Sequence, residues 1–411
     1  MIGDNLQSTE NKTPSFFDLI KTGLYLGATS YGGPAMIGQM KKTIVNDKKW
    51  IDESQFLDAM SFAQILPGAT GVLLMGYIGY VLKNAIGAII ISLFFVLPSA
   101  VAVGFLSFLY FNYKQQTIVI SLFAGLGAMI VSLLVDAILT LGKSVFPTLS
   151  FRFYKGYIIS VVIFILSFWF KYDSVALVLI SAVLGYFFYY SVKDFKNISI
   201  PLPSTESQPL TLRQSLYRKK YDYIFLSALS LFLISIIIFE PQIRIIFLTF
   251  FKIGTFAFGG GYNSIPLLQH ETVNIHKWVS MNQFRDGLAM GQITPGPVLI
   301  TATFIGYKVF GITGAIAATI GIFLPSVIAV ILLNRFHQKI IQMHITHSLI
   351  RGVLAGFIGL LISVTINFGI HSLISWQTWG IFIISLILLA YYKVDALWII
   401  IGTIIISLII I

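Results

Sequence analysis

The chain has 411 residues, of which 57% are hydrophobic and 10% are charged, and its mean hydropathy is +0.88. Apolar runs of about 20 residues, the length that a helix needs to cross about 30 Å of hydrocarbon, recur along nearly the whole chain. These runs do not alternate with polar residues, which excludes a β-barrel. An all-α polytopic membrane protein is therefore predicted.

The formal net charge of +11 does not indicate a nucleic-acid partner, because the cations are scattered through short loops and not gathered on one face. An excess of Lys and Arg in cytoplasmic loops explains it. The absence of cysteine excludes disulfides and thiolate metal sites, and no cofactor or metal is predicted. Because the first 14 residues are polar, the first helix is expected to act as its own insertion signal.

In chain order, six apolar segments come first, at 16–33, 56–82, 86–111, 118–141, 157–170 and 174–190. A hydrophilic stretch at 191–221, with three prolines and a basic cluster, precedes a lone apolar helix at 223–239. Six further segments follow, at 245–258, 284–309, 312–333, 349–370, 378–391 and 396–411. The predicted organisation is a first repeat at 1–191, a basic linker plus extra transmembrane helix at 192–243, and a second repeat at 244–411.

The two sets of six segments are copies, about 227 positions apart. Three motifs of the first copy, Tyr31-Gly32-Gly33-Pro34, Gln64-Ile65-Leu66-Pro67-Gly68 and Leu97-Pro98-Ser99, recur as Phe258-Gly259-Gly260-Gly261, Gln292-Ile293-Thr294-Pro295-Gly296 and Leu324-Pro325-Ser326. Their order and spacing persist with a one-residue slip, which indicates an internal duplication. Since one extra helix separates the copies, the second should enter the membrane upside down, giving about 13 transmembrane segments in inverted topology.

The distribution of cations predicts the orientation. Loops on the amino-terminal side would hold most of them, including Lys143, Arg152, Lys155, Lys277, Arg335, Lys339 and the linker cluster. The N-terminus is therefore predicted to be cytoplasmic and the C-terminus outside, in the inner cell membrane. Lys41, Lys42, Lys48 and Lys49 would lie outside, so either the first segment of each half is re-entrant or the rule is locally broken.

The Gly and Pro motifs predict broken helices near the membrane midplane. Proline removes a backbone donor, glycine admits unusual conformations, and unwound backbone is tolerated at this depth only where protein or a wet cavity covers it. Half-helices that start after such breaks direct N–H groups and about half a positive charge towards an anion. The alternative is that the breaks are packing kinks; the Leu-Pro-Ser motifs are interpreted mainly in that way. The candidate substrate-binding residues at the breaks are Gly32, Gly33, Gln64, Pro67, Gly68, Gly259, Gly260, Gly261, Asn263, Gln292, Thr294, Pro295 and Gly296.

Ionisable residues inside spans are further candidates, because each costs about 2.5–3.5 kcal/mol at a helix centre. Lys252 is the preferred charged contact for the anion, with snorkelling to an interface as the alternative. Asp58 and Asp286 occupy matched positions, where they either cap or salt-bridge at the interface or carry protons. Glu271 and Asp136 are the other proton-coupling candidates.

These motifs resemble the chromate ion transporter family in its long, two-domain form. The similarity is strongest from Phe258 to Ser326, with Phe-Gly-Gly-Gly-Tyr, Lys-Trp, Gly-Gln-x-Thr-Pro-Gly-Pro and Leu-Pro-Ser, and the first half carries a weaker copy. In that copy Tyr31 stands for the usual Phe, Ala69 for the second Pro and Thr43 for the usual acid. The resemblance implies an inner-membrane carrier that exports chromate, a dianion shaped like sulfate, at the expense of the proton-motive force.

Physical reasoning also favours export, because moving a dianion out of an inside-negative cell is downhill by about 4.6 kcal/mol per 100 mV. Alternating access by one half rocking against the other is the expected mechanism, in a monomer or homodimer surrounded by membrane lipid. The alternatives are a transporter or channel for another inorganic anion such as sulfate, and a non-transporting membrane scaffold. An enzyme is disfavoured, since no hydrolase, metalloprotease or phosphate-loop motif is present.

Overall fold

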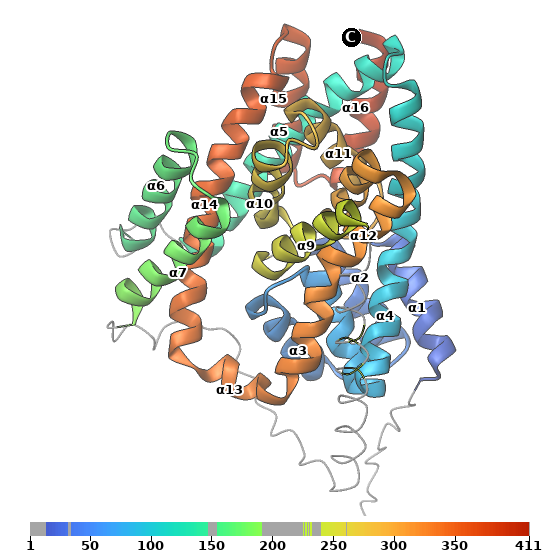
Figure 1. Ribbon diagram of the computed structural model, residues 1–411, viewed down its shortest axis with the longest axis vertical. Helices are drawn as coiled ribbons and strands as arrows, with labels where there is room; N and C mark the ends of the chain where they lie inside the picture. The colour runs from blue at the N-terminus through green and yellow to red at the C-terminus, as the bar shows by residue number, and fades with distance from the viewer. Residues whose placement is uncertain are drawn as a thin grey trace, which may run out of the picture.

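The computed structural model describes residues 14–31, 34–146, 154–190, 225, 227, 229, 231, 240–259 and 261–410. Over these residues every regular element is a helix (Figure 1), so the all-α prediction is confirmed. Most of the predicted linker and of the extra helix at 223–239 lies outside the described residues.

The first half runs through α1 (Phe16–Thr29), α2 (Pro34–Lys41), η1 (Lys42–Asp47), α3 (Glu53–Ile65), α4 (Thr70–Tyr113), α5 (Thr117–Val145), α6 (Tyr154–Phe168) and α7 (Ser174–Tyr189). The second half runs through α9 (Pro241–Phe256), η4 (Tyr262–Ser264), α10 (Ile265–Gln269), η5 (His270–Ile275), α11 (Met281–Ile293), η6 (Val298–Ile300), α12 (Thr301–Leu333), η7 (Asn334–Phe336), α13 (His337–Gln342), α14 (His344–Ser372), α15 (Trp376–Ala390) and α16 (Ala396–Ile410).

Local irregularities recur at the offset of the sequence repeat. The elements η1 and η5 are both π-helices, a rare form that is frequent at functional sites. The helix α4 bends at Asn84 and α12 at Gly311, where φ is +56° and +59°, so each consists of two arms. Gly79 and Gly306 lie against the carbonyls of Gly87 and Gly314 across these bends, where a larger side chain would not fit. The bend at Asn84 lies between the predicted spans 56–82 and 86–111, and the bend at Gly311 lies between the predicted spans 284–309 and 312–333.

The helices differ in whether they are long enough to cross a membrane. Among the described residues, four stretches are long and apolar enough to cross a membrane: α4, α5, 298–333 and α14. The helices α6, α7, α15 and α16 have only 15 or 16 residues, about 24 Å at 1.5 Å per residue. The chain is thus a membrane-integral protein, while the total of 13 spans and the inverted topology remain predictions.

The two halves are interlocked. In each half the first helix packs on the long bent helix, α1 on α4 and α9 on α12, and α4 packs on α12. The helix α5, however, packs on α15 and α16 of the second half, while α14 packs on α6 and α7 of the first. In Figure 1, α14 accordingly lies beside α6 and α7. The sequence halves are therefore not two separate structural bodies.

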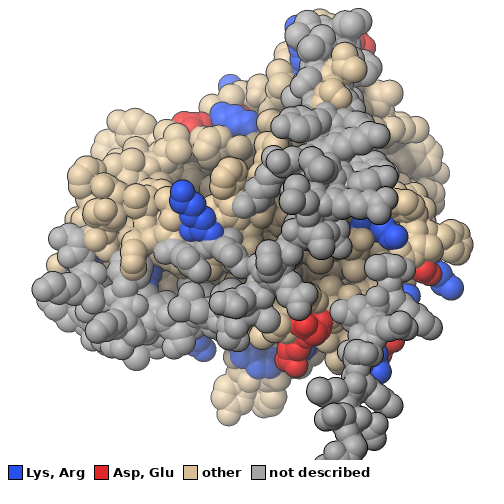
Figure 2. All heavy atoms as spheres, turned by 90° about the horizontal axis from the view of Figure 1, so that it is seen from below, with Lys and Arg blue, Asp and Glu red and all other residues tan. Residues whose placement is uncertain are grey.

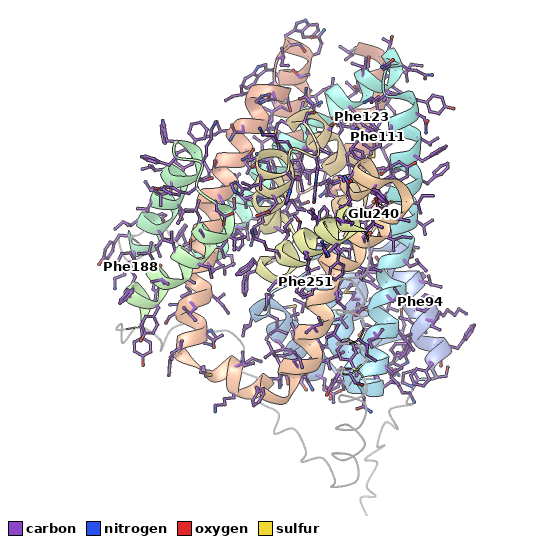
Figure 3. All side chains as sticks on the ribbon, in the orientation of Figure 1. Phe94, Phe111, Phe123, Phe188, Glu240 and Phe251 are labelled. Carbon is purple, nitrogen blue, oxygen red and sulfur yellow. The ribbon has the colours of Figure 1, made fainter. Side chains whose placement is uncertain are left out.

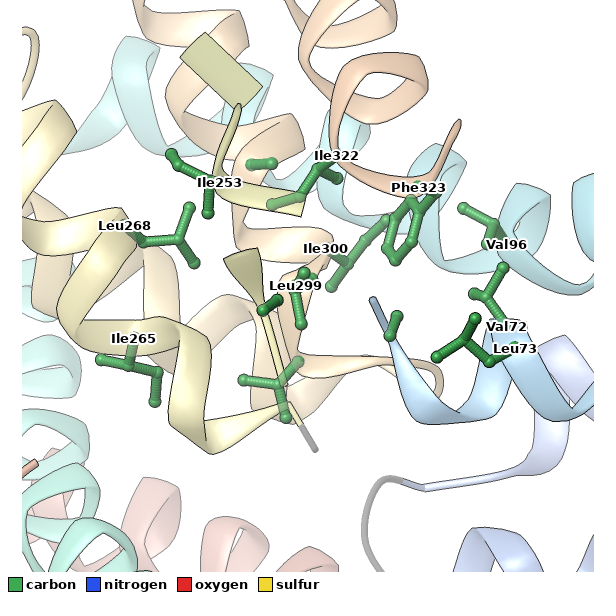
Figure 4. Close-up of a cluster of buried hydrophobic side chains, with 14 of the residues drawn as sticks. Val72, Leu73, Val96, Ile253, Ile265, Leu268, Leu299, Ile300, Ile322 and Phe323 are labelled. Carbon is green, nitrogen blue, oxygen red and sulfur yellow. The ribbon is translucent and has the colours of Figure 1, made fainter. Parts of the chain in front are cut away.

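The core lies where the bent helices meet the broken ones. Figure 4 shows part of it, with Val72 and Val96 from α4 near Ile300 and Phe323, and Ile253 of α9 near Leu268 of α10. Large apolar side chains also cover the outside of the helices, as a bilayer requires (Figure 3). On the lower end of the molecule the visible Lys and Arg are dispersed among Asp, Glu and other residues (Figure 2).

Candidate functional site

The glycine breaks of the two halves meet in the folded chain. The carbonyl of Ser30, at the end of α1, accepts a hydrogen bond of 2.8 Å from the N–H of Gly296. The matching carbonyl of Ala257, after α9, accepts one of 2.5 Å from Gly68. The Pro-Gly break of each half is therefore bound to the end of the first helix of the other half. Four helices, α1, α3, α9 and α11, end here. Hydrogen bonds between the two repeats satisfy backbone groups that these helix ends leave free.

The Leu-Pro-Ser motifs complete this junction. Ser326 Oγ accepts a hydrogen bond of 3.0 Å from the N–H of Ala69, and the Ser326 side chain lies against Gly68. In the same way Ser99 lies against Gly296, where an added Cβ would be 2.7 Å from Ser99 Oγ. The φ angles of Gly68 and Gly296 are +132° and +122°, which side chains rarely tolerate. Both serines thus pack against the breaks, but only Ser326 is hydrogen-bonded to one, because Ser99 Oγ donates to the carbonyl of Val96 in its own helix.

Several predicted donors at the breaks are already engaged by the protein. Asn263 Nδ2 donates to the carbonyls of Phe258 and Gly259, at 3.0 and 3.1 Å, while its Oδ1 is buried without a hydrogen-bond partner. Thr294 Oγ1 donates to the carbonyl of Met290 at 3.2 Å. Both side chains therefore hold the broken backbone in place. Three other candidates, Gly32, Gly33 and Gly260, lie outside the described residues.

At the second break, polar side chains of the described residues contact one another. Tyr262 donates a hydrogen bond of 3.2 Å to Gln292 Oε1, beside Asn263 and Thr294. At the positions that match Tyr262, Asn263 and Thr294, the first half has the apolar residues Ala35, Met36 and Leu66. Gln64, which matches Gln292, is exposed. The two junctions share their backbone geometry, but a hydrophilic ligand would find partners mainly at the second.

An ion pair joins the two elements that precede and follow the Gly259–Gly261 break in the chain, α9 and η5. Lys252 Nζ of α9 is 2.7 Å from Glu271 Oε1 of η5, and the Glu271 side chain is 5% exposed against 42% for Lys252. His276 Nε2 is 3.9 Å from the other carboxylate oxygen and 3.1 Å from Thr249 Oγ1. Two candidates that the sequence analysis assigned to different roles, anion contact and proton carrier, therefore form one unit.

Asp286 is tied to its surroundings, whereas its repeat partner Asp58 is not. Its Oδ2 accepts a hydrogen bond of 2.7 Å from Tyr110 of α4, and its Oδ1 is 3.0 Å from the Arg285 guanidinium. Arg285 also reaches Ser372 Oγ at 3.4 Å. The ring of Tyr110 packs edge-on against Phe123 of α5, with the centroids 5.1 Å apart; Figure 3 labels Phe123 beside Phe111. Within the part of the chain that is described, Asp58 is half-buried and has no ion pair.

The remaining acidic candidate, Asp136, lies on α5, with Oδ1 3.8 Å from the exposed Lys393. His270, 3.3 Å from Asp173 of α7, forms a further contact between the halves that the sequence did not indicate. Sequence reasoning also missed Tyr110 and His276. Only the folded chain shows them, because neither residue type recurs at the matching position of the other copy, where Tyr110 corresponds to His337 and His276 to Lys48.

Interrupted helices in corresponding places of two repeats define this all-helical, membrane-integral chain as transporter-like rather than enzyme-like. The model of the Chromate transporter family matches residues 17–186 and 244–408. The chain therefore belongs to the chromate transporter family, which makes it a transporter and confirms the resemblance. The unmatched interval, 187–243, contains the whole of the predicted linker and extra helix, 192–243.

The chain is similar to several curated proteins along most of its length. It is 32% identical over 396 residues to an uncharacterised transporter of Methanocaldococcus jannaschii, covering 96% of this chain and 94% of that protein. It is 28% identical to a chromate transport protein of Cupriavidus metallidurans, over 91% and 88% of the two chains. A chromate transport protein of Pseudomonas aeruginosa is 26% identical, over 86% and 81%. No solved structure matches the chain.

Proposed function

We propose that this protein exports chromate across the inner membrane and that the electrical component of the proton-motive force drives the export. The observation that carries the proposal is the junction of broken helices from two family-matched repeats, with its polar side chains and Lys252 on one side. Two relatives that align with most of the chain are named chromate transport proteins. A dianion leaving an inside-negative cell gains about 4.6 kcal/mol per 100 mV.

The test uses everted membrane vesicles, in which export appears as accumulation of radiolabelled chromate. Potassium gradients with valinomycin set the membrane potential, and nigericin removes the pH gradient. Accumulation driven by an inside-positive potential is expected, and Lys252→Met should abolish it while Lys83→Met, at the bend of α4, should retain it. Accumulation that ignores the potential would contradict electrogenic export.

A carrier for another oxyanion such as sulfate is the second candidate, because the polar break contains amide and hydroxyl groups that do not distinguish tetrahedral dianions by charge. Excess unlabelled sulfate in the same vesicles separates the two. Strong competition would make chromate one of several substrates. Flux that fails to saturate and does not respond to a counter-gradient would instead indicate a channel.

We further propose alternating access, with units other than the two sequence halves. Rigid rocking of one half against the other is incompatible with the packing of α5 on α15 and α16 and of α14 on α6 and α7. The clearest asymmetry concerns matched elements: α11 packs on α4, α5, α14 and α16, whereas α3 packs mainly on α4 and α13. If α3 took up the packing environment of α11, and α11 that of α3, the protein would change from one state to the other without unfolding the interlocked helices.

This exchange makes a specific prediction. The repeat partner of Tyr110 is His337, so the second state would pair Asp58 with His337 as this one pairs Asp286 with Tyr110. At present His337 lies against the ring of Phe62, one turn beyond Asp58, at 5.1 Å between centroids. Since the chain has no cysteine, thiol pairs placed at these positions can be cross-linked without background. Chromate gradients of opposite direction should shift cross-linking from one pair to the other, and equal cross-linking of both pairs under every condition would refute the exchange.

A further inference from the structure

The pair of Lys252 and Glu271 belongs to the second half alone. At the corresponding positions the first half has Tyr25 and Thr43, which offer no Lys and no carboxylate for such a pair. The pair is also central: α9 and the segment of α10 and η5 lie in the middle of the molecule in Figure 1. It is therefore a feature of one side of the junction and is not explained by the duplicated architecture.

The two partners differ in access. Glu271 is enclosed, with 5% of its side chain exposed, while Lys252 keeps 42% of its side chain exposed. A buried carboxylate is stable only when it is paired or protonated, because desolvation penalises the charged form. Lys252 supplies that pairing, at 2.7 Å. An anion that approached the exposed side of Lys252 would therefore compete with Glu271 for the same ammonium group.

The groups that face Glu271 come from two elements. Lys252 is on α9; His276, which directly follows η5, binds Thr249 of α9, and His270 precedes Glu271 in η5 itself. The ring of His276 is stacked on Trp278, with centroids 4.3 Å apart, and its Nε2 is 3.9 Å from Glu271 Oε2. Beyond His270, α7 contributes Asp173 at 3.3 Å. Lys252 is thus the only group in hydrogen-bonding reach of the carboxylate among the described ionisable residues, with His276 next.

We propose that Glu271 is the resident counter-anion of Lys252, and that an oxyanion occupies Lys252 when a proton neutralises Glu271. The inference rests on the proposed function and adds its coupling. A protonated carboxyl no longer competes for the ammonium group and can itself donate a hydrogen bond to an oxyanion oxygen. Proton and oxyanion binding are then mutually favourable, each strengthening the other by the same factor.

The proposal fixes the charge that is moved. A proton accompanies each dianion, so one net negative charge leaves per cycle instead of two. The membrane potential still favours export, by about 2.3 kcal/mol per 100 mV, while an alkaline interior opposes it. An antiporter, in which the proton and the anion exclude each other, would show the opposite response to a pH gradient.

The experiment measures binding of radiolabelled chromate to the purified full chain in nanodiscs between pH 6 and pH 8.5. For the wild type, the Kd is expected to rise by up to tenfold per pH unit, because each bound anion takes up one proton, in addition to any effect of the protonation of chromate itself. Glu271→Gln, which imitates the protonated form, should bind at least tenfold more tightly than the wild type at pH 8.5. Comparison of the two proteins cancels the chemistry of the anion.

Proton counting provides an independent readout. In weakly buffered solution, chromate binding to the wild type should take up about one proton per anion more than binding to Glu271→Gln. The control is Glu53→Gln, which removes an exposed carboxylate from the Lys41 pair and should behave as the wild type. Lys252→Met should lose binding at every pH, and thermal melting verifies that each variant is folded.

The outcomes separate this inference from the proposed function. If the wild type binds chromate and Glu271→Gln shows the same pH profile and proton uptake, the role of Glu271 is refuted while chromate transport stands. If Glu271→Gln binds more weakly at all pH values, Glu271 is a structural partner of Lys252 and the inference is likewise refuted. If no folded protein binds chromate at any pH, the proposed function fails, and this inference with it.

Discussion

The junction between the halves can be tested at Gly296. In Gly296→Ala the new Cβ would lie 2.7 Å from Ser99 Oγ and 2.8 Å from Ser99 Cβ, both well inside van der Waals contact. The residue also has φ +122°, a conformation that costs a side chain about 1–3 kcal/mol. Overpacking of a tight core adds about 1–3 kcal/mol. The expected loss in the free energy of unfolding is therefore about 2–6 kcal/mol.

Thermal melting in detergent, together with vesicle transport, measures this effect. The matched control is Gly104→Ala on α4, where an added Cβ meets nothing within 4 Å. In a helix interior that change should be neutral or stabilising by about 0.5–1 kcal/mol. Gly296→Ala is thus expected to lower the melting temperature, and Gly104→Ala to leave it unchanged or raise it.

A double variant separates collision from backbone strain. Ser99→Gly removes the atoms that the new Cβ would meet but leaves φ of residue 296 unchanged. Gly296→Ala combined with Ser99→Gly should therefore be less destabilised than the sum of the single variants, by about 1–3 kcal/mol. Additive effects, or a Gly296→Ala protein that melts and transports as Gly104→Ala does, would refute the close approach of the two motifs.

Two further predictions concern helix packing. Asp286→Asn should destabilise the protein by about 3 kcal/mol, because it leaves the Arg285 guanidinium, which is 11% exposed, without a charged partner. Asp58→Asn should change the free energy of unfolding by no more than about 0.5 kcal/mol. Equal melting temperatures of the two variants would contradict the ion pair. Gly352→Leu should separate α14 from α7, because a Cβ there would reach Gly185 Cα at 2.5 Å. Gly402→Leu is the control, because that position faces open space. Thermal melting and gel filtration compare the two variants, and equal behaviour would argue against the packing of α14 on α7.

Sequence reasoning was most reliable where a physical constraint acts on each segment alone. Apolar composition predicts membrane helices because the bilayer leaves no water for unpaired backbone groups, and the helices are present. The bends near Asn84 and Gly311 also agree with the predicted span boundaries. The predicted breaks at Pro67-Gly68 and Pro295-Gly296 coincide with the gaps between α3 and α4 and between α11 and η6, since proline and positive-φ glycine act locally.

Helix length was less predictable. The sequence left open whether the apolar run at 16–33 spans the membrane or is re-entrant, and α1 ends at Thr29 after 14 residues. Hydropathy measures solvation and not the path of the backbone, so it does not reveal where a helix stops within apolar sequence. Donor assignments had the same weakness: Asn263 and Thr294 could be named as hydrogen-bonding residues, but the atoms that their side chains bind depend on backbone brought to them by folding.

The sequence by itself determined that this is a duplicated, all-helical membrane protein with paired breaks, because hydrophobicity, glycine, proline and an internal repeat are properties of the linear chain. Tertiary structure decided which pairs of breaks meet and that Lys252 and Glu271 form one ion pair. It also decided that α5 packs on helices of the second half and α14 on helices of the first. These outcomes depend on contacts between residues from 19 to more than 200 positions apart. Such contacts are chosen by the packing of whole helices, and no local pattern of residues encodes them.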